Sequence, residues 1–143
     1  MFIIIIMLGE KLFEFERKFK GRRVLDAEGP KIETSVLADG KIKEIDITET
    51  VTYCTVPRST DVLYGEGVGV IISKDSRDSG ETATYTAQGI GKFVGSGRIS
   101  FRGSLFFSSL STGKLAFLNN LVGVFEDEVD EAGNTWAKAW EWK

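Results

Sequence analysis

Residues 63–73 read LYGEGVGVIIS, and this stretch decides the fold class. Its three inner glycines alternate with larger side chains, so they share one face of an extended strand. A strand with one bare face bends sharply or lies close beneath another chain segment, as strands do at the corners of barrels. Residues 82–93 repeat the pattern, because Gly89 and Gly91 have the same parity as Ala83 and Tyr85. Two glycine-faced strands therefore predict a strongly curved sheet.

The rest of the chain shows the period-two alternation of half-buried strands, most clearly in residues 98–108 (RISFRGSLFFS). Strands are expected at residues 11–20, 32–37, 41–56, 63–73, 82–93, 98–108, 121–129 and 135–143, and residues 22–28 form a further short segment. Turns are expected at Ala38-Asp39-Gly40 and at residues 74–80, 111–113 and 130–134, and Pro57 is expected to end its strand. About eight short strands without a long helix predict an all-β fold, either a small antiparallel barrel or a sandwich.

The 143 residues fit a single β-barrel domain over residues 1–143, with residues 1–8 (MFIIIIML) as an apolar N-terminal extension. This run is far shorter than the roughly 20 residues that span a bilayer, and it lacks the basic segment and cleavage site of a signal peptide. No membrane association is expected, and Met7 is an alternative start. Four consecutive isoleucines favour a strand or an oligomer contact over a short helix.

Charge and composition exclude several classes of function. The net charge of −3 gives no overall attraction to a phosphate backbone, so no nucleic-acid partner is expected. The chain has no histidine, which removes Ser-His-Asp and Cys-His catalytic sites and most zinc sites. The glycine-rich stretches lack phosphate-loop spacing and the acidic turn lacks EF-hand spacing, so no cofactor and no metal are expected. Cys54 is the single cysteine and excludes an intramolecular disulfide, which suits a cytoplasmic protein.

Several features allow two interpretations. The basic run 17–23 (RKFKGRR) and the acidic run 126–131 (EDEVDE) are typical of solvated strand ends, but their opposite signs also allow a contact between strands or subunits. Trp136, Trp140 and Trp142 share one strand face, which indicates core or an oligomer interface, with a ligand cavity or stacking surface as the alternative. A structural role is favoured for the Cys54 thiol over that of a mild nucleophile.

Two glutamates have the parity of apolar neighbours and are candidates for burial. Glu49 shares its face with Val51 and Tyr53, and Glu66 lies among valines. A buried carboxylate needs a partner, and Arg102 is a cation that could reach one of them. We therefore expect Arg102 to pair with a glutamate inside the fold.

From residue 63 to the C-terminus the strand pattern resembles the allene oxide cyclase and dirigent-like β-barrels. The resemblance rests on the glycine-bearing strand, the GETATY sequence that begins at Gly80, and the GVFE sequence that begins at Gly123. It implies an eight-stranded antiparallel barrel, often trimeric, whose interior holds a hydrophobic ligand. No catalytic residue of the family can be placed on this sequence, because such residues come mainly from the N-terminal half.

Three functions follow as hypotheses. The first is a protein that binds a small apolar molecule in the barrel cavity, the second a cofactor-free isomerase or cyclase acting in that cavity, and the third a structural oligomer with a filled barrel. A homo-oligomer, dimer or trimer, is expected. The candidate ligand-binding residues are Tyr53, Tyr85, Glu49, Glu66, Arg102, Phe101 and Trp140.

Overall fold

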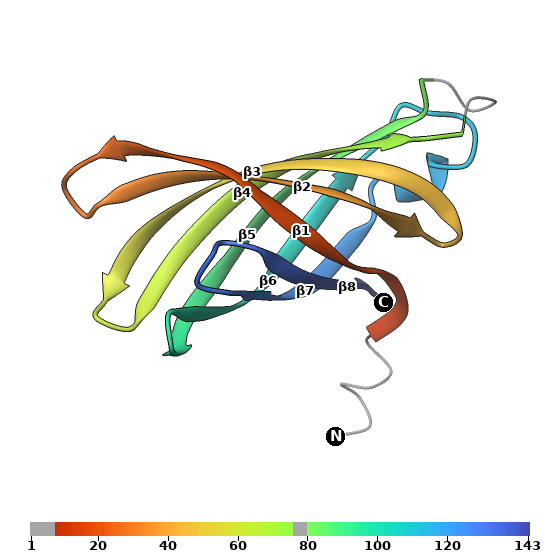
Figure 1. The fold of residues 1–143 in the computed structure, drawn as a ribbon. Helices are drawn as coiled ribbons and strands as arrows, with labels where there is room; N and C mark the ends of the chain where they lie inside the picture. Colours follow the sequence, from red (N-terminus) through yellow and green to blue (C-terminus); the bar gives the residue numbers. More distant parts are fainter. Residues whose placement is uncertain (1–7, 76–79) are drawn as a thin grey trace.

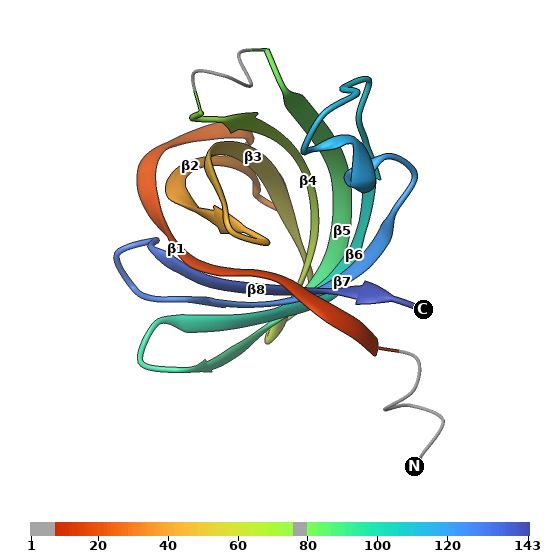
Figure 2. The same cartoon turned by 90° about the vertical axis from the view of Figure 1, so that its right-hand side faces the viewer.

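A computed structural model describes residues 8–75 and 80–143, and its eight strands form one closed antiparallel barrel (Figure 1 and Figure 2). The strands are β1 (Leu8–Asp26), β2 (Lys31–Ile42), β3 (Ile45–Ser59), β4 (Val62–Ser73), β5 (Thr82–Gly95), β6 (Arg98–Ser108), β7 (Val122–Val129) and β8 (Thr135–Trp142). Each strand pairs with the next, and β8 closes the barrel against β1. The predicted all-β fold is confirmed, and the barrel is the correct one of the two predicted architectures.

No helix within the described part of the chain is long and apolar enough to cross a membrane. The strand or oligomer contact expected for the N-terminal isoleucines falls on residues 1–7, which lie outside the described residues; Leu8 is the first residue of β1.

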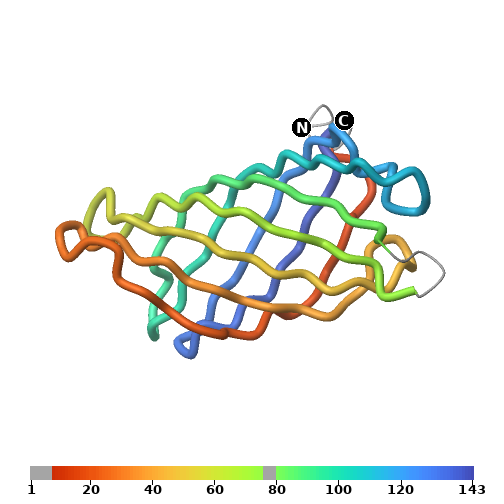
Figure 3. Tube along the Cα trace, turned by 90° about the horizontal axis from the view of Figure 1, so that it is seen from above, coloured from red at the N-terminus to blue at the C-terminus, as the bar shows by residue number. Residues whose placement is uncertain are grey.

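The inward-facing glycines make room for aromatic side chains. The strands run obliquely across the barrel (Figure 3), and the alternating residues of each strand face its interior. A Cβ atom on Gly69 would overlap the ring of Tyr85, and one on Gly91 would overlap the ring of Phe101. The curvature predicted from glycine parity is thus accompanied by close packing of rings against bare backbone.

One predicted turn is wrong, because β2 continues through Asp39 and Gly40. The chain turns instead at Lys43 and Glu44, whose φ angles of 46° and 71° are those of a two-residue hairpin turn. Gly40 has the role that Gly69 has in β4, since a Cβ there would overlap the ring of Phe15. The Asp39-Gly40 sequence therefore does not mark a turn; the glycine is needed because the ring of Phe15 packs against its backbone.

Two other expected boundaries also differ. β1 runs through Gly21 as one strand with an irregularity in its pairing between Phe19 and Gly21, and β3 runs past Pro57, which lies opposite Leu63. Pro57 lies near the end of its strand, where the loss of one ladder donor is tolerated.

The two ends of the barrel differ. At one end a 3-10 turn, η2 (Ala116–Leu118), packs Leu115 and Leu118 into the interior, where both are fully buried. The Glu81 carboxylate accepts hydrogen bonds from the backbone N–H groups of Gly113 (3.2 Å) and Leu115 (2.9 Å), which fixes this plug. The opposite end is formed by the turns β1–β2, β3–β4, β5–β6 and β7–β8 (Figure 1), and we call it the open end because a space of about 400 Å³ lies there.

Candidate functional site

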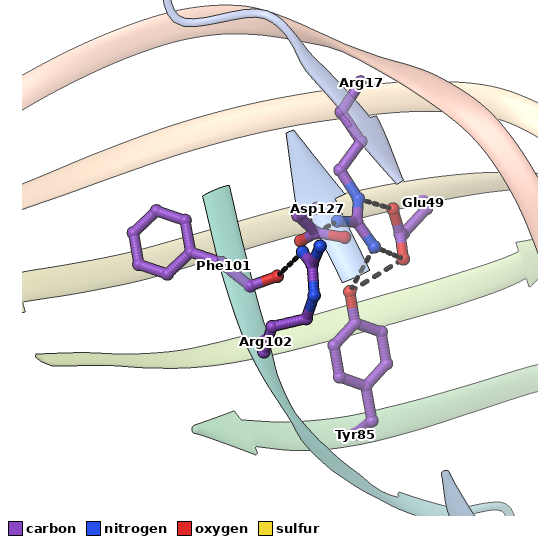
Figure 4. Close-up of polar contacts among 6 residues, drawn as sticks. All are labelled: Arg17, Glu49, Tyr85, Phe101, Arg102 and Asp127. Atoms are coloured by element: carbon purple, nitrogen blue, oxygen red, sulfur yellow. Dashed lines mark hydrogen bonds and ion pairs between the residues drawn. The ribbon is translucent and has the colours of Figure 1, made fainter. Parts of the chain in front are cut away.

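A buried ion pair crosses the interior between β1 and β3. The Arg17 Nε atom donates to Glu49 Oε1 at 2.6 Å, and Arg17 Nη2 donates to Glu49 Oε2 at 3.1 Å (Figure 4). Both side chains are buried, and Glu49 has no exposed surface. Bidentate pairing of this kind fixes the direction of both groups.

Two further side chains complete what we call the buried network: Arg17, Glu49, Tyr85 and Asp127. From β5, the Tyr85 hydroxyl donates to Glu49 Oε2 at 2.7 Å. From β7, Asp127 Oδ2 accepts a hydrogen bond from Arg17 Nη1 at 3.0 Å. Four strands thus send one polar group each to the centre of the barrel.

Burial sets the protonation behaviour of the network. It raises the pKa of the Asp127 carboxyl to about 6 from an ordinary 3.8; the Arg17 guanidinium opposes this rise and the Glu49 carboxylate adds to it. Burial and the adjacent Glu49 also hold the pKa of the Tyr85 hydroxyl well above its usual value. Tyr85 therefore stays protonated as a donor, whereas Asp127 can change its charge near neutral pH.

Two oxygens of this region have no hydrogen-bond partner. Among the described residues, Asp127 Oδ1 and Thr135 Oγ1 are the buried side-chain N or O atoms left unpaired. Asp127 on β7 pairs with Ala137 on β8, and Thr135 lies two residues before Ala137 on the same strand. Asp127 and Thr135 are therefore diagonal neighbours on the inner face of the barrel. A buried unpaired polar atom costs free energy and needs an explanation.

Both residues line a cavity of about 60 Å³ on the open side of the network. Apolar groups form most of its wall, including Val36, Val51, Ala87, Leu105 and Phe125. Next to it lies a wider space of about 400 Å³, which we call the mouth. The mouth is lined by residues that include Ile32, Pro57, Leu63, Phe93 and Ile99. Tyr53, Phe101 and Val129 line both spaces, so the mouth adjoins the cavity.

Four predicted ligand-binding residues lie inside the barrel. Glu49 and Tyr85 belong to the buried network, and Tyr53 and Phe101 stand at the boundary of cavity and mouth, with their ring centroids 6.4 Å apart. Sequence parity placed them correctly on the inner face. Their predicted role in binding stays a prediction.

The other three lie on the outer surface. The exposed Glu66 carboxylate accepts a hydrogen bond from the Tyr64 hydroxyl at 2.6 Å, although Glu66 is also among the residues that line the cavity. Arg102 pairs with Glu126 and Glu128 across β6 and β7, at 3.6 Å and 3.3 Å. The predicted pairing of Arg102 with a buried glutamate is therefore wrong. Phe101 points into the barrel, so the next residue of β6, Arg102, points outward. The position beside Glu49 is occupied by Arg17 instead.

Trp140 lies with Trp136 and Trp142 on the outer face of β8. Trp136 and Trp142 are 45% and 52% exposed, and Trp136 Nε1 donates to Glu14 at 3.2 Å. The inner face of β8 instead carries small residues, Ala137 and Ala139, against the core. The tryptophan stripe therefore lines neither the core nor the cavity. Cys54 also lies on an outer face, opposite in direction to Tyr53, and is half-buried.

Arg17, Asp127 and Thr135 are the site residues that the sequence analysis missed. The signal was parity within the two charged runs: Arg17 follows Phe13 and Phe15 at alternate positions, and Asp127 lies between inward-facing positions of β7. The Arg17–Asp127 pair is a contact between the basic and acidic runs, one of the two interpretations left open.

Within residues 8–75 and 80–143, no three His, Cys, Asp or Glu side chains come together as a metal ion would require. Comparisons of the chain with protein-family models, with curated proteins and with solved structures found no match.

Proposed function

We propose that the barrel binds a small, mostly apolar molecule between the buried network and the open end. The observation that carries this proposal is the pair of unpartnered oxygens, Asp127 Oδ1 and Thr135 Oγ1, beside an apolar cavity that adjoins the mouth. A few convergent polar groups in an apolar pocket are typical of small-molecule sites.

The dimensions limit how the molecule would lie. The cavity of about 60 Å³ is well below the several hundred Å³ of an ordinary ligand pocket, so it takes only the polar end of a ligand. The apolar body would lie in the mouth, against side chains such as Pro57, Leu63 and Phe93. The buried network would keep the inner end rigid, which lowers the cost of ordering the site on binding.

Titration with the neutral, polarity-sensitive dye N-phenyl-1-naphthylamine tests the proposal. We expect its fluorescence to rise on binding to the wild-type protein. Ala87→Leu adds side-chain volume at the cavity wall, and we expect it to weaken binding by about tenfold, equivalent to about 1.4 kcal/mol.

Thr86→Leu is the matched control, because Thr86 is adjacent in β5 but exposed on the outer surface, where it lines a second groove. Its binding curve should match that of the wild type. If Thr86→Leu changes the titration and Ala87→Leu does not, the dye occupies the outer groove and the proposal fails. The alternative of a structural oligomer with a filled barrel predicts no saturable binding by any variant.

A cofactor-free isomerase acting in the same cavity is a second candidate. Asp127 favours it, because a carboxyl with a pKa of about 6 beside a cavity can both accept and donate a proton near neutral pH. Deuterium incorporation from D₂O into a bound carbonyl compound, measured by mass spectrometry, tests this candidate. We expect Asp127→Asn to abolish the incorporation; exchange that persists in the variant counts against an enzymatic role.

The expected homo-oligomer, dimer or trimer, is part of the proposal. Its support is the outer face of β4 and β6, where Val68, Val70, Ile72 and Phe106 are 40% to 57% exposed. Light scattering should report an oligomer for the wild type and a smaller species for Val70→Glu; a wild-type monomer would contradict the expectation. The resemblance to the allene oxide cyclase and dirigent-like barrels stays a prediction.

A cytoplasmic location is proposed on the lone thiol of Cys54, which fits a reducing compartment. Subcellular fractionation tests it, and recovery of the protein outside the cytoplasm would contradict it.

A further inference from the structure

The charge of the buried network is unbalanced. It contains one cation, Arg17, and two carboxylates, Glu49 and Asp127. When both carboxylates are ionised, the network carries one uncompensated negative charge in a setting where burial makes such a charge costly. A positively charged group in the adjoining cavity would remove that imbalance.

The guanidinium of Arg17 is already committed to protein partners. Its Nε and Nη2 atoms donate to Glu49, and its Nη1 atom donates to Asp127. An anionic ligand would therefore meet carboxylates without a free cation to receive it. Carboxylate and phosphate ligands are disfavoured by this arrangement.

The two unpaired oxygens require hydrogen-bond partners. An ionised Asp127 only accepts hydrogen bonds, whereas the Thr135 hydroxyl can accept or donate. An ammonium group offers three N–H donors for these oxygens and brings the positive charge that the network lacks, whereas an alcohol can donate to Asp127 and accept from Thr135 but brings no charge. A charge-assisted bond to Asp127 would also be stronger than a neutral one.

We infer that the ligand is a primary amine, whose ammonium group binds between Asp127 and Thr135 while its apolar body lies in the mouth. The inference rests on the proposed function and names the chemical class of its ligand. The mouth itself agrees with a cation, since its lining includes the carboxylates Asp130 and Glu131 and the single guanidinium of Arg22 among the described residues.

Three six-carbon probes of matched length test the inference: n-hexylamine, 1-hexanol and hexanoate. Their affinities are measured by displacement of N-phenyl-1-naphthylamine and by calorimetry. At about pH 7.5 we expect hexylamine to bind at least about tenfold more tightly than hexanol, and hexanoate more weakly than either. Because Asp127 titrates near pH 6, the advantage of hexylamine should shrink at about pH 5, whereas hexanol binding should change little.

Several groups bear on the titration of Asp127 and must stay unchanged in the experiment: Arg17, Glu49, Tyr53, Tyr85 and Glu128. Asp127→Asn should abolish the preference for hexylamine over hexanol while retaining dye binding, which reports that the barrel is folded. Thr135→Val, which keeps the shape of the side chain, should reduce the preference by several-fold.

Asp46→Asn is the control for attraction to the outer surface, because it removes an exposed carboxylate that lines neither the cavity nor the mouth. It should leave all three affinities unchanged. If hexanol binds as tightly as hexylamine, or if Asp127→Asn keeps the preference, the inference is overturned and the proposed function stands. If neither the dye nor any probe binds the wild-type protein, the proposed function fails as well.

Discussion

Replacing Asp127 by asparagine should change how the stability of the barrel depends on pH. The pKa of this carboxyl is about 6 in the folded chain against an ordinary 3.8. The folded state therefore binds the proton more tightly than the unfolded state. Stability from this group is fully present below the unfolded pKa and is lost as the pH rises through the folded pKa.

The size of the effect follows from the two pKa values. A difference of about two units corresponds to about 3 kcal/mol over the whole titration, at about 1.4 kcal/mol per unit. Between about pH 4.5 and about pH 7 the loss is about 2 kcal/mol. Asparagine does not titrate, so the variant should lack this loss, and it keeps an oxygen that can accept from Arg17.

Urea unfolding of the wild type and of Asp127→Asn, across that pH range, measures the effect. The quantity of interest is the change with pH in the difference between their free energies of unfolding, because titrating groups that do not interact with Asp127 cancel in it. With increasing pH, the variant should gain about 2 kcal/mol relative to the wild type. Parallel curves for Asp127→Asn, or a gap that moves in the opposite direction, would refute the reasoning.

Three other substitutions should affect stability measurably. Arg17→Met leaves buried carboxylates without their cation and should lower the free energy of unfolding by about 3–5 kcal/mol in urea denaturation; a loss below 1 kcal/mol would contradict the buried ion pair. Gly69→Ala places a methyl group on the ring of Tyr85 and should cost about 1–3 kcal/mol, whereas Gly21→Ala, with nothing within 4 Å, should be nearly neutral; equal thermal shifts would contradict the packing role. Thr135→Val removes an unpaired buried hydroxyl, so the ligand-free protein should gain about 1 kcal/mol by chemical denaturation, and a clear loss would show that this hydroxyl has a partner.

Parity within single strands could predict much of the fold. The side-chain period of two assigned Glu49, Tyr85 and Phe101 to the inner face before any pairing was known. It also grouped the glycines of β4 and those of β5 on one face of each strand, and the structure shows this to be the inner face, where the aromatic rings need space. These inferences needed only local alternation.

The errors come from features that local alternation does not determine. Asp39-Gly40 has the composition of a turn, but the position of Gly40 under Phe15 depends on β1, which is distant in the sequence. Glu66 lies among valines, yet in a closed barrel these valines face outward because the glycines of the same strand face inward. Apolar neighbours therefore did not indicate the buried face there.

The buried network could be predicted only in part. Glu49 was identified because it shares a strand face with apolar residues and a buried carboxylate needs a partner. Arg102 was chosen as that partner because it is a cation, without knowledge of which strand positions face each other. Arg17 lay within a run of cations that is typical of a solvated strand end, and its inward direction follows from its spacing to Phe13 and Phe15. The partners of Arg17 are 32 and 110 residues away in the sequence, so closure of the barrel is what brings them together.

Native mass spectrometry of the gently purified, full-length protein tests the central claim, that the barrel binds a small molecule between the network and the open end, most directly. It is recorded on the protein as purified and again after incubation with n-hexylamine, 1-hexanol and the dye. We predict a saturable adduct of one small molecule per chain, released by collisional activation and reduced in Ala87→Leu but not in Thr86→Leu. A wild-type chain that stays bare under all of these conditions would contradict the account.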